Sequence, residues 1–299
     1  MVAMKGVRPS IDVYKVLLPS LEAREYSLVE DREAIERHYR GEPISCTTGF
    51  ERNRERVRSS LVNLFDDIWE EYGLPRENII EYGSGATGYY DAFLRPRNIK
   101  NWLQIEINPT AIAENRRRNP RANIVEGSYN DIQYKNVPMI TGLSSFDTSE
   151  NLYHAMNQVA TALESGGYFL HVQDVRPGVT TVLNYLHKKG INSKTFLGPS
   201  KVVCGDMLAV INGNPVPTVD IFRDALGDAI KSQPNLDLVE NTYFTLIESN
   251  GKLTYEVYDA NVYLEIPLHN LLSFGDIDEV GHLIGRREVC VLATIARKK

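Results

Sequence analysis

The chain has 299 residues, of which 42% are hydrophobic and 24% charged, with a formal net charge of −6 and a sequence pI of about 5.6. These values are ordinary for a soluble globular protein, and the acidic balance argues against nucleic acid as the main partner. No run approaches the roughly 20 apolar residues that a membrane helix needs, and the first residues lack the apolar core of a secretory signal. The 3 cysteines are far apart, which predicts neither a disulfide framework nor a metal site. We therefore expect a cytoplasmic protein.

The first zone, residues 1–75, has the pattern of a helical segment. Apolar residues recur with helical spacing on one face of residues 50–72, and Gly73 follows as a stop signal. A shorter, charged helix is expected over residues 31–39 and ends at Gly41.

The second zone, residues 76–175, alternates short apolar runs with helical stretches. The apolar runs cover residues 78–82, 101–107, 122–126, 137–143 and 167–174, and the helical stretches cover 88–94, 109–118 and 151–164. Alternation of this kind favours an α/β fold with a parallel sheet that helices cover on both faces.

The third zone, residues 176–299, is less regular. Helices are expected over residues 179–189 and 219–231. Asn250-Gly251 separates two strand-like runs, 241–247 and 252–258, and is a strong hairpin signal because both residues tolerate positive φ. A last strand is expected over residues 288–296.

Three glycines, Gly83, Gly85 and Gly88, follow the first apolar run with the spacing G-x-G-x-x-G. Glycine lets the backbone turn sharply and allows a ligand to come close, and the amides at the start of the next helix point toward that ligand. By itself this spacing fits a dinucleotide site, another nucleotide-like site or a plain structural turn.

Glu106 ends the second apolar run, about 20 residues after the glycine turn. In a doubly wound sheet this position lies beside the end of the first strand, where a carboxylate can accept hydrogen bonds from both ribose hydroxyls of an adenosine. Such charge-assisted bonds contribute roughly 1.5–3 kcal/mol each. The competing interpretation is a strand-end glutamate at the surface.

Glu81 precedes the first glycine by two residues. A carboxylate at this place repels a pyrophosphate and attracts the ammonium and sulfonium of a methionine moiety. Roughly 80 residues of helical character precede the turn, whereas dinucleotide domains more often begin near it. Both features favour S-adenosyl-L-methionine over NAD(P).

With these motifs the sequence resembles the class I S-adenosylmethionine-dependent methyltransferases over about 100 residues, 78–175. The resemblance implies a doubly wound, seven-stranded, mostly parallel sheet with one reversed strand, a Rossmann-like fold. It also implies a helical cap (1–75) and a catalytic domain (76–299) with an insertion, and possible lid, at about 191–233. It implies S-adenosyl-L-methionine as cofactor, held by Glu81, Tyr82, Gly83, Ser84, Gly85, Gly88, Glu106, Ile107, Gly127, Ser128, Tyr129 and Ser144.

Three further residues are candidates for the chemistry of methyl transfer. Asp147 follows the fourth apolar run, and His171 and Asp174 lie on or just past the fifth. A general base is needed only if the nucleophile arrives protonated. Asp147 is equally suited to capping the next helix, and the apolar neighbours of His171 suit a core histidine.

The expected acceptor is the O or N atom of a small molecule. After the fourth run the sequence has neither the Asn-Pro-Pro-Tyr tetrapeptide of adenine methylation nor a cysteine for attack on cytosine. The basic stretch Arg116-Arg117-Arg118 keeps an RNA or protein methyltransferase open as an alternative. An NAD(P)-dependent oxidoreductase and a binding protein without turnover also remain open, and the oligomeric state is not predicted.

Overall fold

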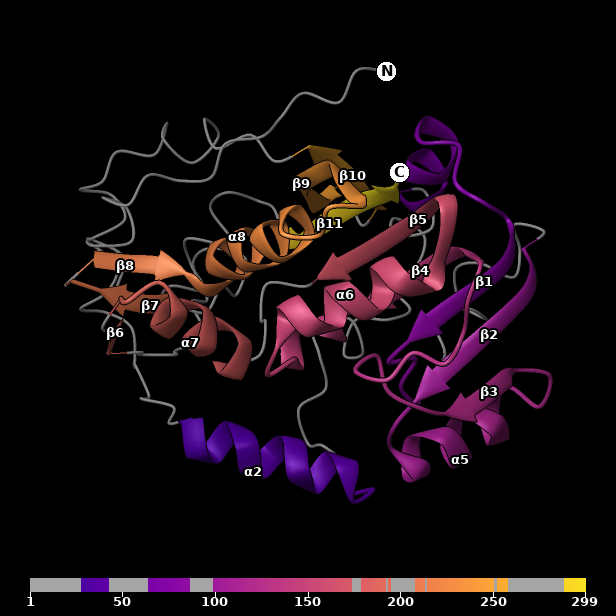
Figure 1. Cartoon of the computed structure of the whole chain (residues 1–299), viewed down its shortest axis with the longest axis horizontal. Helices are drawn as coiled ribbons and strands as arrows, with labels where there is room; N and C mark the ends of the chain where they lie inside the picture. Colours follow the sequence, from indigo (N-terminus) through magenta and orange to yellow (C-terminus); the bar gives the residue numbers. More distant parts are fainter. Residues whose placement is uncertain are drawn as a thin grey trace.

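A computed structural model describes residues 28–42, 64–86, 99–173, 179–191, 193–194, 208–212, 214–249, 252–257 and 288–299 of the chain. Its centre is a mixed sheet with the strand order β10-β9-β11-β5-β4-β1-β2-β3 (Figure 1). A second sheet of three short strands, in the order β6-β7-β8, lies to one side of it.

Five neighbouring strands of the main sheet run parallel. They are β1 (Glu77–Tyr82), β2 (Lys100–Glu106), β3 (Asn123–Glu126), β4 (Val137–Leu143) and β5 (Leu163–Gln173). The chain builds the sheet outward from β1 to β3 and then returns to place β4 on the other side of β1. The strand order therefore reverses between β1 and β4, and in open α/β sheets ligands bind at the carboxyl ends of the strands beside such a switch point.

The remaining strands of the main sheet come from the end of the chain. β11 (Glu288–Lys298) is antiparallel to both β5 and β9 (Leu236–Ser249), so β9 runs with the parallel set. The predicted seven-stranded sheet with one reversed strand is thus confirmed. β10 (Lys252–Val257) pairs with β9 and adds an eighth strand at the edge.

Helices pack on both faces of the sheet, as the alternating pattern predicts. One face is covered by α6 (Leu152–Ala162), α7 (Val179–Lys188) and α8 (Thr218–Lys231). The other face is covered by a helix over residues 64–71, which places apolar side chains against β1, β2 and β4. From Ile79 to Tyr82, β1 is buried on both faces, so its burial is continuous instead of alternating, and Glu81 lies within the buried part.

The boundaries follow the sequence patterns, with two clear differences. β9 begins at Leu236, five residues before the expected start at 241. α6 ends at Ala162 and β5 begins at once with Leu163, four residues before the expected start. Leu163 pairs with Val137, the register then shifts, and Gly166 adopts a φ of 81°. The expected helical segments 88–94 and 50–63 lie outside the described residues.

The stretch 191–233 contains the small sheet, made of β6 (Ser193–Lys194), β7 (Leu208–Ile211) and β8 (Asn214–Pro217). It also contains α8, whose apolar face is buried against α6, β9 and β11. Within this stretch, α8 is part of the helical layer on the main sheet. The domain boundaries and the role of the insertion stay predictions.

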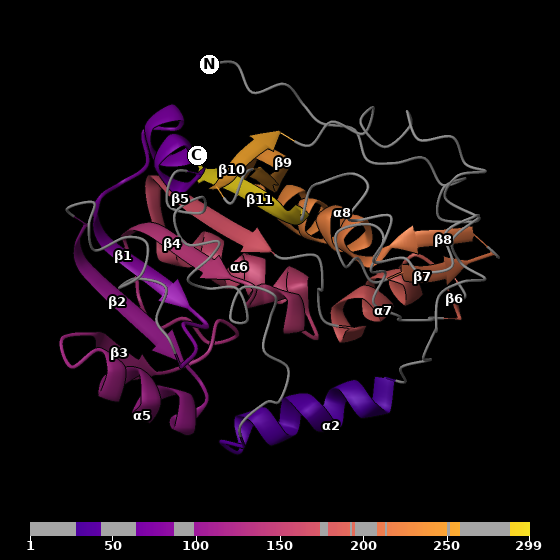
Figure 2. The ribbon, with the colours of Figure 1, turned by 180° about the vertical axis from the view of Figure 1, so that it is seen from behind.

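The N-terminal helix α2 (Leu28–Tyr39) stands apart from both helical layers. In both views it runs below the carboxyl ends of the parallel strands and next to α7 (Figures 1 and 2). It therefore lies on the side of the sheet where the fold places a ligand. Among the helices that the structure describes, none combines the length and apolar character needed to cross a membrane.

Candidate functional site

The glycine turn begins where β1 ends. Gly83 and Gly85 have φ angles of 72° and 64°, in the left-handed region that favours glycine. The backbone N–H groups of Gly83 and Ser84 donate to the carbonyl of Ile105 on β2, at 2.8 and 3.3 Å. A side chain at position 83 would overlap that of Ser145, which follows β4. The turn is thus tightly enclosed between the ends of β2 and β4.

Glu106, at the carboxyl end of β2, is buried and is bonded to the glycine turn. Its Oε2 accepts a hydrogen bond from Gly85 N at 2.8 Å, and its Oε1 accepts from Ile107 N and Asn108 N at 2.8 and 2.9 Å. Burial raises the pKa of this carboxyl, but His38 and the backbone donors outweigh burial and leave the pKa below its ordinary value. The structure thus places an ionised carboxylate directly beside the turn, where the spacing predicts it.

A buried amide on α5 (Pro109–Arg118) supports the turn from below. Asn115 is fully buried, and its Nδ2 donates to Gly85 O at 3.1 Å and to Gln104 Oε1 at 3.0 Å. The Gly85 residue is therefore held through its N–H by Glu106 and through its carbonyl by Asn115. The sequence analysis did not identify Asn115 or Gln104. Nothing in the helical pattern of residues 109–118 distinguishes an asparagine that bonds the turn from an ordinary buried residue.

Glu81 lies beneath the turn on the face of the sheet that the helix over residues 64–71 covers. Its side chain is 2% exposed, and Trp102 Nε1 donates to its Oε2 at 2.9 Å. Burial raises the pKa of Glu81 to about 7, and nearby Glu106 adds to the rise. The carboxyl therefore carries a charge that depends on pH in the neutral range, and a nearby cation would favour the ionised form.

The loop after β3 lies against the other side of Glu106. Gly127 N donates to Glu106 O at 3.1 Å, and a side chain at position 127 would crowd Ile105. Tyr129 stacks on Phe146 at 4.7 Å between ring centroids, and its hydroxyl bonds Thr148 Oγ1 at 3.0 Å. Ser128 Oγ accepts from Asn130 N at 3.1 Å, so this hydroxyl stabilises the loop itself.

The loop after β4 brings two serines to the glycine turn. Ser144 has a φ of 48° and donates its backbone N–H to Val172 O on β5 at 2.8 Å. The hydroxyls of Ser84 and Ser145 are buried and have no hydrogen-bond partner among the described residues. Buried polar groups are seldom left unpaired, so these two hydroxyls fit a polar ligand at the turn.

Asp147 lies just beyond this loop in a short helical turn, Phe146–Thr148. It is buried, and Gln173 Nε2 donates to its Oδ2 at 3.3 Å. Its backbone carbonyl accepts from Thr181 Oγ1 of α7 at 2.6 Å. The carboxyl thus belongs to a buried polar group that joins β4, β5 and α7.

His171 lies in the core instead of at an exposed edge. It is 0% exposed among the rings of Phe146, Phe169 and Phe222, and burial lowers its pKa to about 3. Neither ring nitrogen has a hydrogen-bond partner in the described part of the chain. This surrounding does not support contact with a substrate, and it agrees with the core interpretation of His171.

Of the other predicted site residues, Tyr82 turns its side chain into the core, so it offers a ligand its backbone alone. Ile107 contributes the backbone N–H that Glu106 binds. Gly88 and Asp174 lie outside the described residues.

The basic stretch on α5 is engaged by neighbouring groups of the protein. Arg117 and Arg118 both bond Glu114, at 2.7 and 2.6 Å. Arg116 donates to the carbonyl of Ile124 on β3 at 2.9 Å. Each of the three guanidinium groups therefore has a partner within the protein, and Glu114 supplies one negative charge among them.

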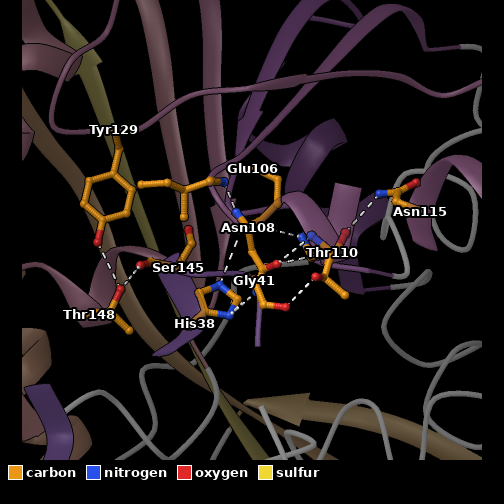
Figure 3. Close-up of polar contacts among 12 residues, drawn as sticks. His38, Gly41, Glu106, Asn108, Thr110, Asn115, Tyr129, Ser145 and Thr148 are labelled. Carbon is orange, nitrogen blue, oxygen red and sulfur yellow. Dashed lines mark hydrogen bonds and ion pairs between the residues drawn. The ribbon is translucent and has the colours of Figure 1, made fainter. Parts of the chain in front are cut away.

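The end of α2, within the zone expected to cap the site, lies on the ligand side of the sheet, and the sequence analysis did not identify its residues 38–41. His38 lies against Glu106 and Asn108, and the Thr110 hydroxyl donates to the carbonyl of Gly41 (Figure 3). Burial, Glu150 and Glu106 raise the pKa of Tyr39, and a hydrogen bond with Tyr129 partly opposes them. Residues 38–41 therefore span the site from α5 to the loop after β3.

No family model and no curated protein matches this sequence. Among solved structures, the chain is similar to the plantazolicin methyltransferase BpumL in complex with SAH. The two are 13% identical, with a TM-score of 0.44 and 97% of each chain covered. The chain is also similar to the N-methyltransferase NodS from Bradyrhizobium japonicum in complex with S-adenosyl-L-homocysteine. The identity is 12% and the TM-score 0.43, and the match covers 90% of this chain and 98% of NodS.

A third similar structure is an S-adenosylmethionine-dependent methyltransferase from Clostridium acetobutylicum, at 10% identity and a TM-score of 0.41. The match covers 80% of this chain and 91% of the Clostridium protein. Similarity at this level carries no argument about this chain. The strand order described above is by itself that of a doubly wound, Rossmann-like sheet.

Proposed function

We propose that the chain is an S-adenosyl-L-methionine-dependent methyltransferase. The observation that carries this proposal is the ionised carboxylate of Glu106, bonded to Gly85 N at the switch point of the sheet. An adenosine ribose placed there can donate its hydroxyls to the carboxylate, and the glycine turn gives the remainder of the ligand close access to the backbone.

The other residues around the turn suit the parts of this cofactor. The free hydroxyls of Ser84 and Ser145 suit its amino-acid end, and the backbone of 127–129 together with Tyr129 suits the adenine. Glu81 suits a cationic ligand, since a positive charge nearby would draw its carboxyl into the ionised form. S-Adenosylmethionine supplies a methyl group that its sulfonium has already activated.

The protein's part is then to orient the acceptor toward the methyl carbon and to keep water away. Positioning of this kind is worth roughly 7–11 kcal/mol. We assign the orienting role to Asp147, whose carboxyl is buried beyond the end of β4. Asp174 is retained as a candidate, whereas the burial of His171 argues against its contact with the acceptor.

For the acceptor we propose the O or N atom of a small molecule. The net charge of −6 and the internal pairing of the Arg116–Arg118 stretch argue against a polyanion. The end of α2 lies across the ligand side of the sheet, which favours a small acceptor over a large one.

Calorimetric titration with S-adenosylhomocysteine tests the proposal. We expect micromolar affinity in the wild type and a loss of 10-fold or more in Glu106→Ala, from the hydrogen bonds that the ribose would lose. Glu114→Gln, which removes a partly exposed carboxylate from α5, is the matched control and should bind normally. Binding of NADH without binding of S-adenosylhomocysteine would instead support an oxidoreductase.

A further inference from the structure

The orientation of the His38 ring is determined by its neighbour Asn108. Asn108 Oδ1 accepts from Thr110 N and Ala111 N at 2.8 and 3.1 Å, which caps α5 and fixes the side-chain amide. Its Nδ2 therefore faces His38 Nδ1, 2.9 Å away, and acts as the donor. Nδ1 then carries no proton, so the ring proton lies on Nε2.

This proton faces the carboxylate that the proposed function assigns to the ribose. His38 Nε2 lies 3.6 Å from Glu106 Oε1, and the imidazole is 27% exposed. The distance is that of a loose polar contact, not of a strong hydrogen bond. His38 can therefore leave Glu106 at modest cost.

The carboxylate has little capacity left for further donors. An ionised carboxylate offers about four acceptor positions. Backbone N–H groups of Gly85, Ile107 and Asn108 already occupy three of them, two of these on Oε1. With His38 Nε2 near Oε1, four donors face the carboxylate, so a ribose hydroxyl can bind it only where one of them leaves. His38, at 3.6 Å, is the most distant of the four.

We infer that His38 competes with the ribose diol of an adenosine-containing ligand for the Glu106 carboxylate, so that the end of α2 is a gate on the cofactor site. The inference rests on the proposed function. Contacts on both sides hold the end of α2 at this place. Gly41, with a φ of 84°, accepts a hydrogen bond from the Thr110 hydroxyl, and α2 lies along α7. Entry of the ribose requires His38, and with it the end of α2, to move away from Glu106.

The test compares S-adenosylhomocysteine affinity in the wild type and in His38→Ala. Removal of the competitor should tighten binding about 2- to 5-fold, the range expected for loss of a weak, partly exposed polar contact. Arg37→Ala, which changes the exposed preceding residue on the same helix, is the matched control and should bind like the wild type. Weaker or unchanged binding by His38→Ala would overturn the gate, because weaker binding marks His38 as a ligand contact.

A second pair of ligands separates competition from a general effect on the fold. 5′-Methylthioadenosine carries the ribose diol, whereas its 2′,3′-dideoxy analogue does not. The gain from His38→Ala should appear with the first and vanish with the second. An equal gain with both would contradict competition at Glu106. If the wild type and His38→Ala both fail to bind S-adenosylhomocysteine, the proposed function fails and the gate fails with it.

Discussion

Replacing Asn115 by alanine tests whether the glycine turn depends on the hydrogen bonds that this side chain donates from α5. The substitution removes the two hydrogen bonds that Asn115 Nδ2 donates, at 3.1 Å to Gly85 O and at 3.0 Å to Gln104 Oε1. Gln104 is buried, so the loss of its partner costs about 1–3 kcal/mol, and the partly buried Gly85 carbonyl adds about 1 kcal/mol. The higher helix propensity of alanine returns about 0.5 kcal/mol. We therefore expect the free energy of unfolding to fall by about 1.5–3.5 kcal/mol.

The ligand should sense the same change. Once the Gly85 carbonyl is free, the turn and the N–H that binds Glu106 are less well ordered, so part of the binding energy is spent on ordering them. We expect S-adenosylhomocysteine to bind Asn115→Ala several-fold more weakly. The assays are urea unfolding, followed by tryptophan fluorescence, and calorimetric titration.

Asn157→Ala on α6 is the control, since Asn157 is an exposed helical asparagine. It should bind like the wild type and gain about 0.5 kcal/mol of stability, the helix-propensity term alone. The contrary outcome is that Asn115→Ala unfolds at the wild-type urea concentration and binds S-adenosylhomocysteine equally well. That result would show that Asn115 does not hold the turn, and it would refute the reasoning from its two hydrogen bonds.

Two other substitutions give distinct outcomes. Gly83→Ala places a side chain at a φ of 72° and against Ser145, so the variant should lose at least about 2 kcal/mol of stability and all measurable ligand binding; a wild-type melting curve would contradict the crowding described at this turn. Glu81→Gln keeps an acceptor for Trp102 but does not titrate. The pKa of Glu81 is raised to about 7 from an ordinary 4.5, so the folded state holds this proton more tightly than the unfolded state does. As the pH rises from about 4.5 through 7, the wild type should therefore lose about 3 kcal/mol of stability relative to Glu81→Gln. A stability difference that stays constant between pH 5 and 8 would show that burial does not perturb this carboxyl.

The sequence predicted the sheet well because its central strands are buried on both faces. Short apolar runs that alternate with helical stretches located β1 to β5 within a few residues. Glu106 was predictable for a related reason, since the length of one strand–helix–strand unit fixes where the second strand ends relative to the glycine turn.

Other parts of the site depend on contacts between distant segments, which periodicity does not reveal. His38 meets Glu106 across 68 positions of sequence only because α2 lies along the carboxyl ends of the strands. Asn115 and Gln104 look like ordinary members of a helix and a strand until the two elements pack together. The early start of β5 was missed because Gly166, which suggests a turn, lies inside the strand as a register irregularity.

A crystal structure of the chain with S-adenosylhomocysteine tests the central claim most directly. The account predicts the ligand at the carboxyl ends of β1, β2 and β4, with its ribose hydroxyls on the Glu106 carboxylate and its amino-acid end at the glycine turn. The cavity facing the sulfur would then define the size and polarity of the acceptor. A ligand bound elsewhere, or a ribose that makes no contact with Glu106, would contradict the account.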